Sequence, residues 1–183
     1  RSQSGIVRVF KRLVICRTTN SERLQNEKRR EGSNMTLAKI VYASMTGNTE
    51  GIAEILEENF TEQGIDVQRF EADAADSDIF EDADICVVAT YTYNDGEIPF
   101  DFEDFYDELP DQDLAGKVFG VVGSGDSELY PDYFCKAADD FAEAFQQAGA
   151  QNGAETVKIE NEADDEVVKV LAAFVKGLIA AGA

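Results

Sequence analysis

From residue 35 onward, short apolar runs alternate with longer segments in which apolar residues recur at helical spacing. These patterns predict strands at about 37–43, 65–70, 85–89, 118–122 and 155–159. They also predict helices at about 48–63, 102–109, 132–147 and 164–180. Strands that alternate with helices form a parallel sheet covered on both faces. We therefore predict an α/β fold with a doubly wound, five-stranded parallel sheet.

Charge divides the chain into two parts. Residues 1–34 hold nine basic and three acidic residues, for a net charge of +6, whereas residues 35–183 hold seven basic and thirty-four acidic residues, for −27. We expect residues 1–34 to be a disordered basic leader and residues 35–183 to be the folded domain. Because the first methionine is Met35, one hypothesis is that translation starts there and the leader is an artefact. A basic targeting or interaction arm is the alternative.

Composition excludes several functions. The chain has no histidine, so Ser-His-Asp and Cys-His catalysis and histidine metal ligation are excluded. Its three cysteines, Cys16, Cys86 and Cys135, form no CxxC pair, which favours a reduced cytoplasmic protein without a metal centre. The acidic domain should repel nucleic acid and anionic membranes, and no apolar run approaches the roughly 20 residues of a membrane span.

The segment Ser44–Thr49, with the sequence SMTGNT, directly follows the first predicted strand and opens the first predicted helix. Hydroxyl groups and backbone amides at a helix N-terminus bind anions. The segment contains no Lys or Arg, so it is not the phosphate loop of ATP- or GTP-binding proteins. We expect it to hold a single phosphate group. The alternative is a simple helix cap made by Ser44 or Asn48.

Two further polar loops follow the third and fourth predicted strands. The first of them reads TYTYNDGEIPF (90–100) and the second reads GSGDSELYPDYF (123–134). Ligands of open parallel sheets bind at the carboxyl ends of the strands, where the strand order reverses. All three loops should therefore meet at that end. A phosphate site beside two tyrosine-bearing loops suits a flat, phosphorylated ring system.

These three loops resemble those of short-chain flavodoxins, the electron-transfer proteins that carry FMN. SMTGNT is similar to the family's [ST]-x-T-G-x-T phosphate loop, and the other two loops match its ring-binding loops in the same order. The resemblance covers residues 35–183 and implies the flavodoxin-like strand order 2-1-3-4-5. It also implies FMN as the cofactor, with no catalytic residue and no metal.

The resemblance implies a role for each matching position. The FMN phosphate would be bound by Ser44, Met45, Thr46, Gly47, Asn48 and Thr49. The isoalloxazine ring would be bound by Thr92, Tyr93, Asn94, Asp95, Ser124, Gly125, Asp126 and Tyr130. Tyr93 and Tyr130 would stack on its two faces. Two other tyrosines, Tyr91 and Tyr133, are as readily explained as core or rim residues.

Asn94 departs from the family pattern, because many members have Gly at this position. In such members, a flip of the peptide bond at this position stabilises the neutral semiquinone of the flavin. Asn accepts left-handed backbone conformations less readily than Gly. We therefore expect the flipped form to cost more in this chain and the semiquinone to be less stable.

The resemblance implies a low-potential one-electron carrier that uses the semiquinone/hydroquinone couple, and not an enzyme. Acidic residues in and after the two ring loops, with no cation nearby, should lower the second potential; each contributes roughly 0.4 kcal/mol at about 10 Å in water. The acidic residues are Asp95, Glu97, Asp101, Glu103, Asp104, Asp126, Glu128 and Asp132. We expect a monomer that docks transiently on basic-surfaced redox enzymes, such as flavodoxin/ferredoxin reductases and other oxidoreductases. One alternative is a flavodoxin-like FMN protein dedicated to one partner, for example in the activation of ribonucleotide reductase. Another is a non-redox phosphate-binding or receiver-like module.

Overall fold

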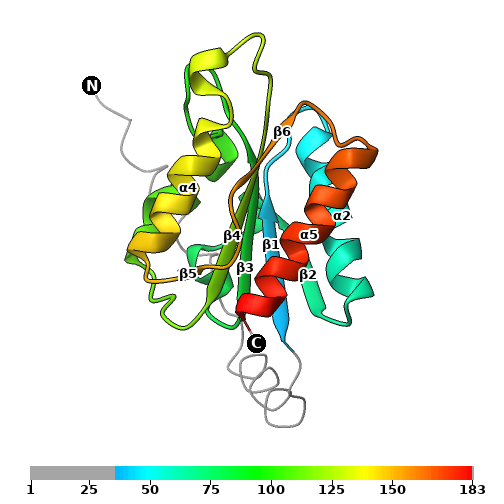
Figure 1. Ribbon diagram of the computed structural model, residues 1–183. Helices are drawn as coiled ribbons and strands as arrows, with labels where there is room; N and C mark the ends of the chain where they lie inside the picture. The colour runs from blue at the N-terminus through cyan, green and yellow to red at the C-terminus, as the bar shows by residue number, and fades with distance from the viewer. Residues whose placement is uncertain (1–35, 183) are drawn as a thin grey trace, which may run out of the picture. The chain divides into compact units, whose positions relative to one another are not determined.

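The computed structural model describes residues 36–182 (Figure 1). The predictions about a basic leader at 1–34 and a start at Met35 lie outside these residues. Within them, six strands pair in parallel: β1 (Leu37–Tyr42), β2 (Asp66–Glu71), β3 (Ile85–Tyr91), β4 (Val118–Gly125), β5 (Gln151–Asn152) and β6 (Val157–Glu160). The order is β2-β1-β3-β4, and β5 and β6 both pair with β4. This order confirms the predicted doubly wound parallel sheet.

The fifth position in the sheet differs from the single strand predicted at 155–159. Two short strands occupy it, because β5 pairs with Val118 and Phe119 and β6 pairs with the other end of β4. Gly153 lies between them, and a Cβ atom built on it would be 2.2 Å from Cγ1 of Val118. The backbone therefore passes too close to β4 for a side chain at this point, and position 153 requires glycine.

Among the described residues, four α-helices cover the two faces of the sheet: α2 (Asn48–Glu62), α3 (Glu103–Glu108), α4 (Lys136–Gln147) and α5 (Asp165–Ala181). Helices α2 and α5 pack on one face, and α3 and α4 pack on the other. Gly64 follows α2 with a left-handed φ of +74°, a conformation that commonly ends a helix. In the described part of the chain, no helix combines the length and apolarity that a bilayer crossing requires.

The core between the sheet and helices α2 and α5 is aliphatic for the most part. Ile40, Val87 and Val122 of the sheet pack with Ile52 of α2 and Leu171 of α5. Helix α5 buries Leu171, Phe174, Val175 and Leu178, whereas Val170 is exposed.

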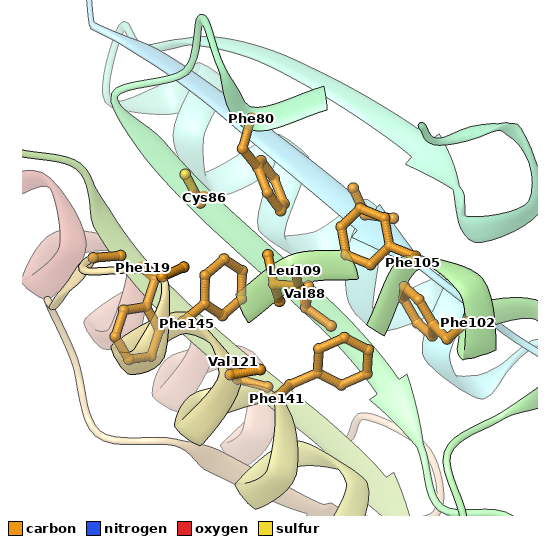
Figure 2. Close-up of a cluster of buried hydrophobic side chains, with 14 of the residues drawn as sticks. Phe80, Cys86, Val88, Phe102, Phe105, Leu109, Phe119, Val121, Phe141 and Phe145 are labelled. Carbon is orange, nitrogen blue, oxygen red and sulfur yellow. The ribbon is translucent and has the colours of Figure 1, made fainter. Parts of the chain in front are cut away.

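The core on the other face is aromatic. Six buried phenylalanines, from the sheet, from α3 and α4 and from two 3-10 turns, gather beside Val88 and Val121 (Figure 2). The rings are those of Phe80, Phe102, Phe105, Phe119, Phe141 and Phe145. Phe119 and Phe145 stack with ring centroids 4.9 Å apart, and Phe102 meets Phe141 edge to face at 4.8 Å. This interlocked cluster fixes α4, and with it the loop that precedes α4.

Two lysines hold the short connection between β2 and β3, which contains only 3-10 turns (Ala72–Ala74 and Ser77–Phe80). Lys39, buried in β1, donates from Nζ to the carbonyl of Ile79 at 2.9 Å and pairs with Asp82. Lys117 donates from Nζ to the carbonyl of Ala83 at 2.8 Å. These bonds satisfy carbonyl groups that a crossover helix would otherwise have satisfied internally.

Candidate functional site

Three loops meet at the carboxyl edge of the sheet, at the upper end of Figure 1. The first loop (43–47) follows β1, the second loop (92–99) follows β3 and the third loop (126–135) follows β4. The three strands are direct neighbours in the sheet. Their ends are also in register, because Tyr42 lies opposite Ala89 and Tyr91 lies opposite Ser124. The predicted convergence of the loops is therefore confirmed.

The first loop leaves the N-terminus of α2 without a side-chain cap. Its N-cap residue is Gly47, in a left-handed conformation with φ of +95°, and no side chain caps the helix. Oγ of Ser44 accepts from the amide of Gly47 at 3.1 Å, which closes the loop on itself. The amides of the first turn of a helix have no partner inside the helix. They are thus available to an anion, as a phosphate site requires.

Helix α5 provides the contrast. Its N-cap, Asp164, accepts with Oδ1 from the amides of Glu166 at 3.0 Å and Val167 at 2.8 Å. The α5 terminus is therefore satisfied by its own side chain. The helix-cap interpretation of the first loop is wrong, since neither Ser44 nor Asn48 caps α2. Met45, Thr46 and Gly47 are exposed, whereas Thr49 is buried in the first turn.

The second loop is a tight hairpin. Tyr93 and Glu97 exchange two backbone hydrogen bonds, of 3.0 and 2.8 Å. Asn94 and Gly96 in the turn between them both have positive φ, of +43° and +99°. Asn94, predicted to resist a left-handed backbone more than Gly would, already adopts one here. Its side chain donates from Nδ2 to Oε2 of Glu97 at 3.0 Å.

Thr92 connects the second loop to α4. Its Oγ1 accepts from the amide of Ala137, the second residue of α4, at 3.2 Å. The N-cap of α4 itself is Cys135, which provides no side-chain cap. Thr92 thus supplies the cap from another loop. Its hydroxyl oxygen is engaged by α4, so its predicted contact with the ring would involve its backbone. No sequence pattern signals this bond, because the two residues are 45 positions apart.

The second and third loops also contact each other. A Cβ atom on Gly96 would lie 2.8 Å from Cδ1 of Tyr133 and 2.9 Å from Cδ of Lys136. Glycine at position 96 therefore permits the close approach of the two loops. Tyr133, assigned from the sequence to the core or the rim, lies at the junction of these loops and is partly exposed.

The third loop is folded by Asp126. Oδ1 of Asp126 accepts from the amides of Glu128 and Leu129 at 3.0 and 2.9 Å, and its carbonyl accepts from the amide of Tyr130 at 3.0 Å. The side chain of Asp126 is thus used within the loop. Ser124, predicted with it, belongs to β4 and is buried. Its hydroxyl donates to the carbonyl of Asn161 at 2.7 Å, so it points toward the β6–α5 turn.

Exposed apolar side chains concentrate at these loops. Tyr93 is 40% exposed and Tyr130 is 45% exposed, as residues that stack on a ligand would be before it binds. Phe100, at 79%, and Leu129, at 71%, are more exposed still and were not predicted as site residues. In the sequence, each of these two residues is an apolar residue in a polar loop, outside any helix or strand periodicity that would predict burial. This was the signal that could have identified them.

Lys136 corrects one electrostatic expectation. The predicted absence of nearby cations is wrong, because Lys136 packs against Gly96 of the second loop. Its Nζ pairs with Asp140 at 2.6 Å, and this hydrogen bond is the main cause that raises the pKa of Lys136. The carboxylate of Asp140 offsets much of its charge. Within residues 36–182, no group of three or more acidic or cysteine side chains is placed to hold a metal ion.

The geometry is that of a ligand site with two parts. An uncapped helix N-terminus is suited to a phosphate, and two loops with exposed tyrosines, which approach each other at Gly96, are suited to a flat ring. The residues present therefore fit a phosphorylated ring cofactor.

Comparisons with known proteins agree on one family. Residues 40–173 match the family model for flavodoxin. The chain is 38% identical to probable flavodoxin 2 of Bacillus subtilis over 141 residues, which cover 75% of this chain and 92% of that protein. It is 37% identical to the flavodoxin of Maridesulfovibrio salexigens over 138 residues, 73% of this chain and 93% of that protein.

Solved structures give the same result. A short-chain flavodoxin associated with a PDU bacterial microcompartment superposes with a TM-score of 0.79 at 44% identity, covering 81% of this chain and 100% of that one. The Streptococcus pneumonia TIGR4 flavodoxin superposes with a TM-score of 0.76 at 50% identity, covering 79% of this chain and 99% of that one.

Proposed function

The chain belongs to the flavodoxin family of FMN-dependent electron carriers, and we propose that it shuttles single electrons between redox enzymes at low potential. FMN supplies the one-electron chemistry. The protein binds the cofactor, orients its ring and sets its potential. The observation that carries this proposal is the uncapped N-terminus of α2 beside the exposed Tyr93 and Tyr130, at the end of the sheet where the order of strands reverses.

Each part of the site has a task in this proposal. The amides of the first turn of α2, with the hydroxyl groups of Thr46 and Ser44 beside them, would bind the FMN phosphate. Tyr93 and Tyr130 would enclose the ring and exclude water from its faces. The hairpin at Asn94 would present backbone groups to the reactive edge of the ring.

A low potential follows from the charges around the ring loops. Seven of the eight acidic residues named above are exposed, and Asp126 is half-buried. Their repulsion of an added electron is small for each and grows with their number. The pair Lys136–Asp140 adds no net positive charge to oppose them.

The same acidic surface supports transient docking on basic partners. Residues 35–183 carry a net charge of −27, which accelerates encounter with a basic surface in a salt-dependent way. Phe100 and Leu129 place apolar contact area beside the ring loops. Basic-surfaced redox enzymes, including flavodoxin or ferredoxin reductases, are the partners that this chemistry suits.

The direct test is a stepwise anaerobic redox titration of the full chain loaded with FMN. We expect bound flavin and two separate one-electron steps, with the second at a clearly lower potential. Protein that binds no FMN, or that takes up both electrons in one step, would contradict the proposal.

The phosphate subsite can be tested separately with a matched pair of variants. Thr46→Asp places a carboxylate at the exposed first loop and should lower FMN affinity at least about tenfold. Thr61→Asp places the same charge near the far end of α2 and serves as the control. Riboflavin, which lacks the phosphate, should bind the wild type and both variants with the same affinity. Equal FMN affinity in Thr46→Asp and Thr61→Asp would exclude the first loop as the phosphate site.

A further inference from the structure

The end of β4 and the start of the third loop are tied to the end of β6 and the turn that follows it. The amide of Ser127 donates to Oε1 of Glu160 at 2.8 Å. The amide of Asn161 donates to the carbonyl of Gly125 at 2.7 Å, and the hydroxyl of Ser124 donates to the carbonyl of Asn161 at 2.7 Å. Three short hydrogen bonds thus join two segments about 35 residues apart.

The turn itself has a conformation that few residues adopt. Asn161 has a φ of +55°, one of three positive values outside glycine among the described residues. This backbone directs both its amide and its carbonyl toward the last two residues of β4, which lead directly into the third loop. Left-handed backbone at a residue other than glycine is usually kept where the surroundings determine it.

These bonds act on the part of the loop that is predicted to face the ring. Ser127 follows Asp126, which folds the loop by accepting from the amides of Glu128, Leu129 and Tyr130. Anchoring Ser127 therefore fixes the Asp126 turn, and the turn fixes the backbone at Tyr130. Without the anchor, that turn would remain formed but could move relative to the sheet.

We propose that Glu160 and Asn161 are positioning residues for the ring subsite, holding Asp126 and Tyr130 in place from outside the three loops. This inference rests on the proposed function, because it assigns the ring to the third loop. Neither residue needs to touch the cofactor. The phosphate subsite at α2 follows a different strand, β1, and is independent of this anchor.

The experiment separates the two subsites with three ligands: FMN, riboflavin and inorganic phosphate. In Glu160→Ala, titration of the apoprotein should show riboflavin and FMN affinities lowered by the same factor, about five- to tenfold, since a hydrogen bond to a charged acceptor is lost. The affinity for inorganic phosphate should equal that of the wild type. Hydrogen exchange at the Ser127 amide should be faster, and this is measured without any ligand.

Two variants control for charge. Glu160→Gln retains an acceptor oxygen and should restore riboflavin affinity. Glu162→Ala removes an exposed carboxylate two residues away and should leave it unchanged. Wild-type riboflavin affinity in Glu160→Ala would overturn the inference, as would an equal loss in Glu162→Ala. Wild-type protein that binds no FMN would overturn the proposed function and this inference with it.

Asn161 offers a second test that depends on backbone and not on charge. Asn161→Gly can keep a φ of +55° and should bind riboflavin like the wild type. Asn161→Val strongly disfavours that conformation and should lose affinity as Glu160→Ala does. Far-UV circular dichroism and thermal unfolding show that each variant is folded. Equal riboflavin binding by folded Gly and Val variants would overturn the role of Asn161.

Discussion

Nδ2 of Asn94 donates to Oε2 of Glu97 at 3.0 Å, and the two residues belong to the turn of the hairpin in the second loop. The backbone amide of Glu97 also donates to the carbonyl of Tyr93 at 2.8 Å. Side-chain and backbone bonds thus hold the same turn. Any rearrangement of the peptide after Asn94 must therefore work against the side-chain bond as well as the backbone bond.

Asn94→Gly should therefore raise the maximum fraction of one-electron-reduced flavin. Glycine removes the side-chain bond to Glu97 and gives the rearranged peptide a wider range of backbone angles. The fraction is measured by absorption during anaerobic titration of the FMN-loaded protein. An unchanged maximum would contradict this expectation.

Two variants of Glu97 separate the bond from the charge. Glu97→Gln keeps an acceptor for Asn94 and removes the charge, whereas Glu97→Ala removes both. If the bond restrains the turn, only Glu97→Ala should raise the maximum fraction of one-electron-reduced flavin, as Asn94→Gly does.

Thr92→Val should destabilise the apoprotein by about 1 kcal/mol, because the amide of Ala137 loses the acceptor that caps α4. Thr92→Ser retains a hydroxyl oxygen and should recover most of that loss. Urea unfolding followed by far-UV circular dichroism measures both. A Thr92→Val protein with the wild-type midpoint and slope would show that water replaces the cap without loss.

Lys39→Met should lower the free energy of unfolding by about 1–3 kcal/mol. Methionine fills a similar volume but leaves the carbonyl of Ile79, which accepts from Lys39 at 2.9 Å, without that donor. The exposed Lys169, which pairs with Glu166 on α5, is the matched control, and Lys169→Met should change stability by less than about 0.5 kcal/mol. Equal effects of the two variants would refute the role of Lys39 in holding the β2–β3 connection.

Alkaline pH should destabilise the fold partly through Cys86. Burial raises the pKa of this thiol to about 12, from 9.0 in its ordinary state. Above pH 9 the unfolded thiol loses its proton while the folded thiol keeps it, so the stabilising contribution is lost between pH 9 and about 12. The free energy of unfolding should fall less steeply across pH 9–11 in Cys86→Ala than in the wild type. Parallel pH profiles would contradict this.

The order of strands and helices could be predicted because it depends on local periodicity. Apolar runs at 37–43, 85–89 and 118–122 predicted β1, β3 and β4 within a few residues, and SMTGNT located the uncapped end of α2. Hydrophobic spacing is fixed by the repeat of each element, so it can be recognised within a short segment.

Only the tertiary structure decided where individual side chains point and what they bond. Thr92 turns to α4, Ser124 turns to Asn161, and Lys136 lies against Gly96, although all three are in or beside loops recognised from the sequence. These partners are separated by tens of residues, and no local period relates them. The sequence therefore determined which loops meet at the candidate site, and long-range contacts decided which groups in those loops are already bonded within the protein.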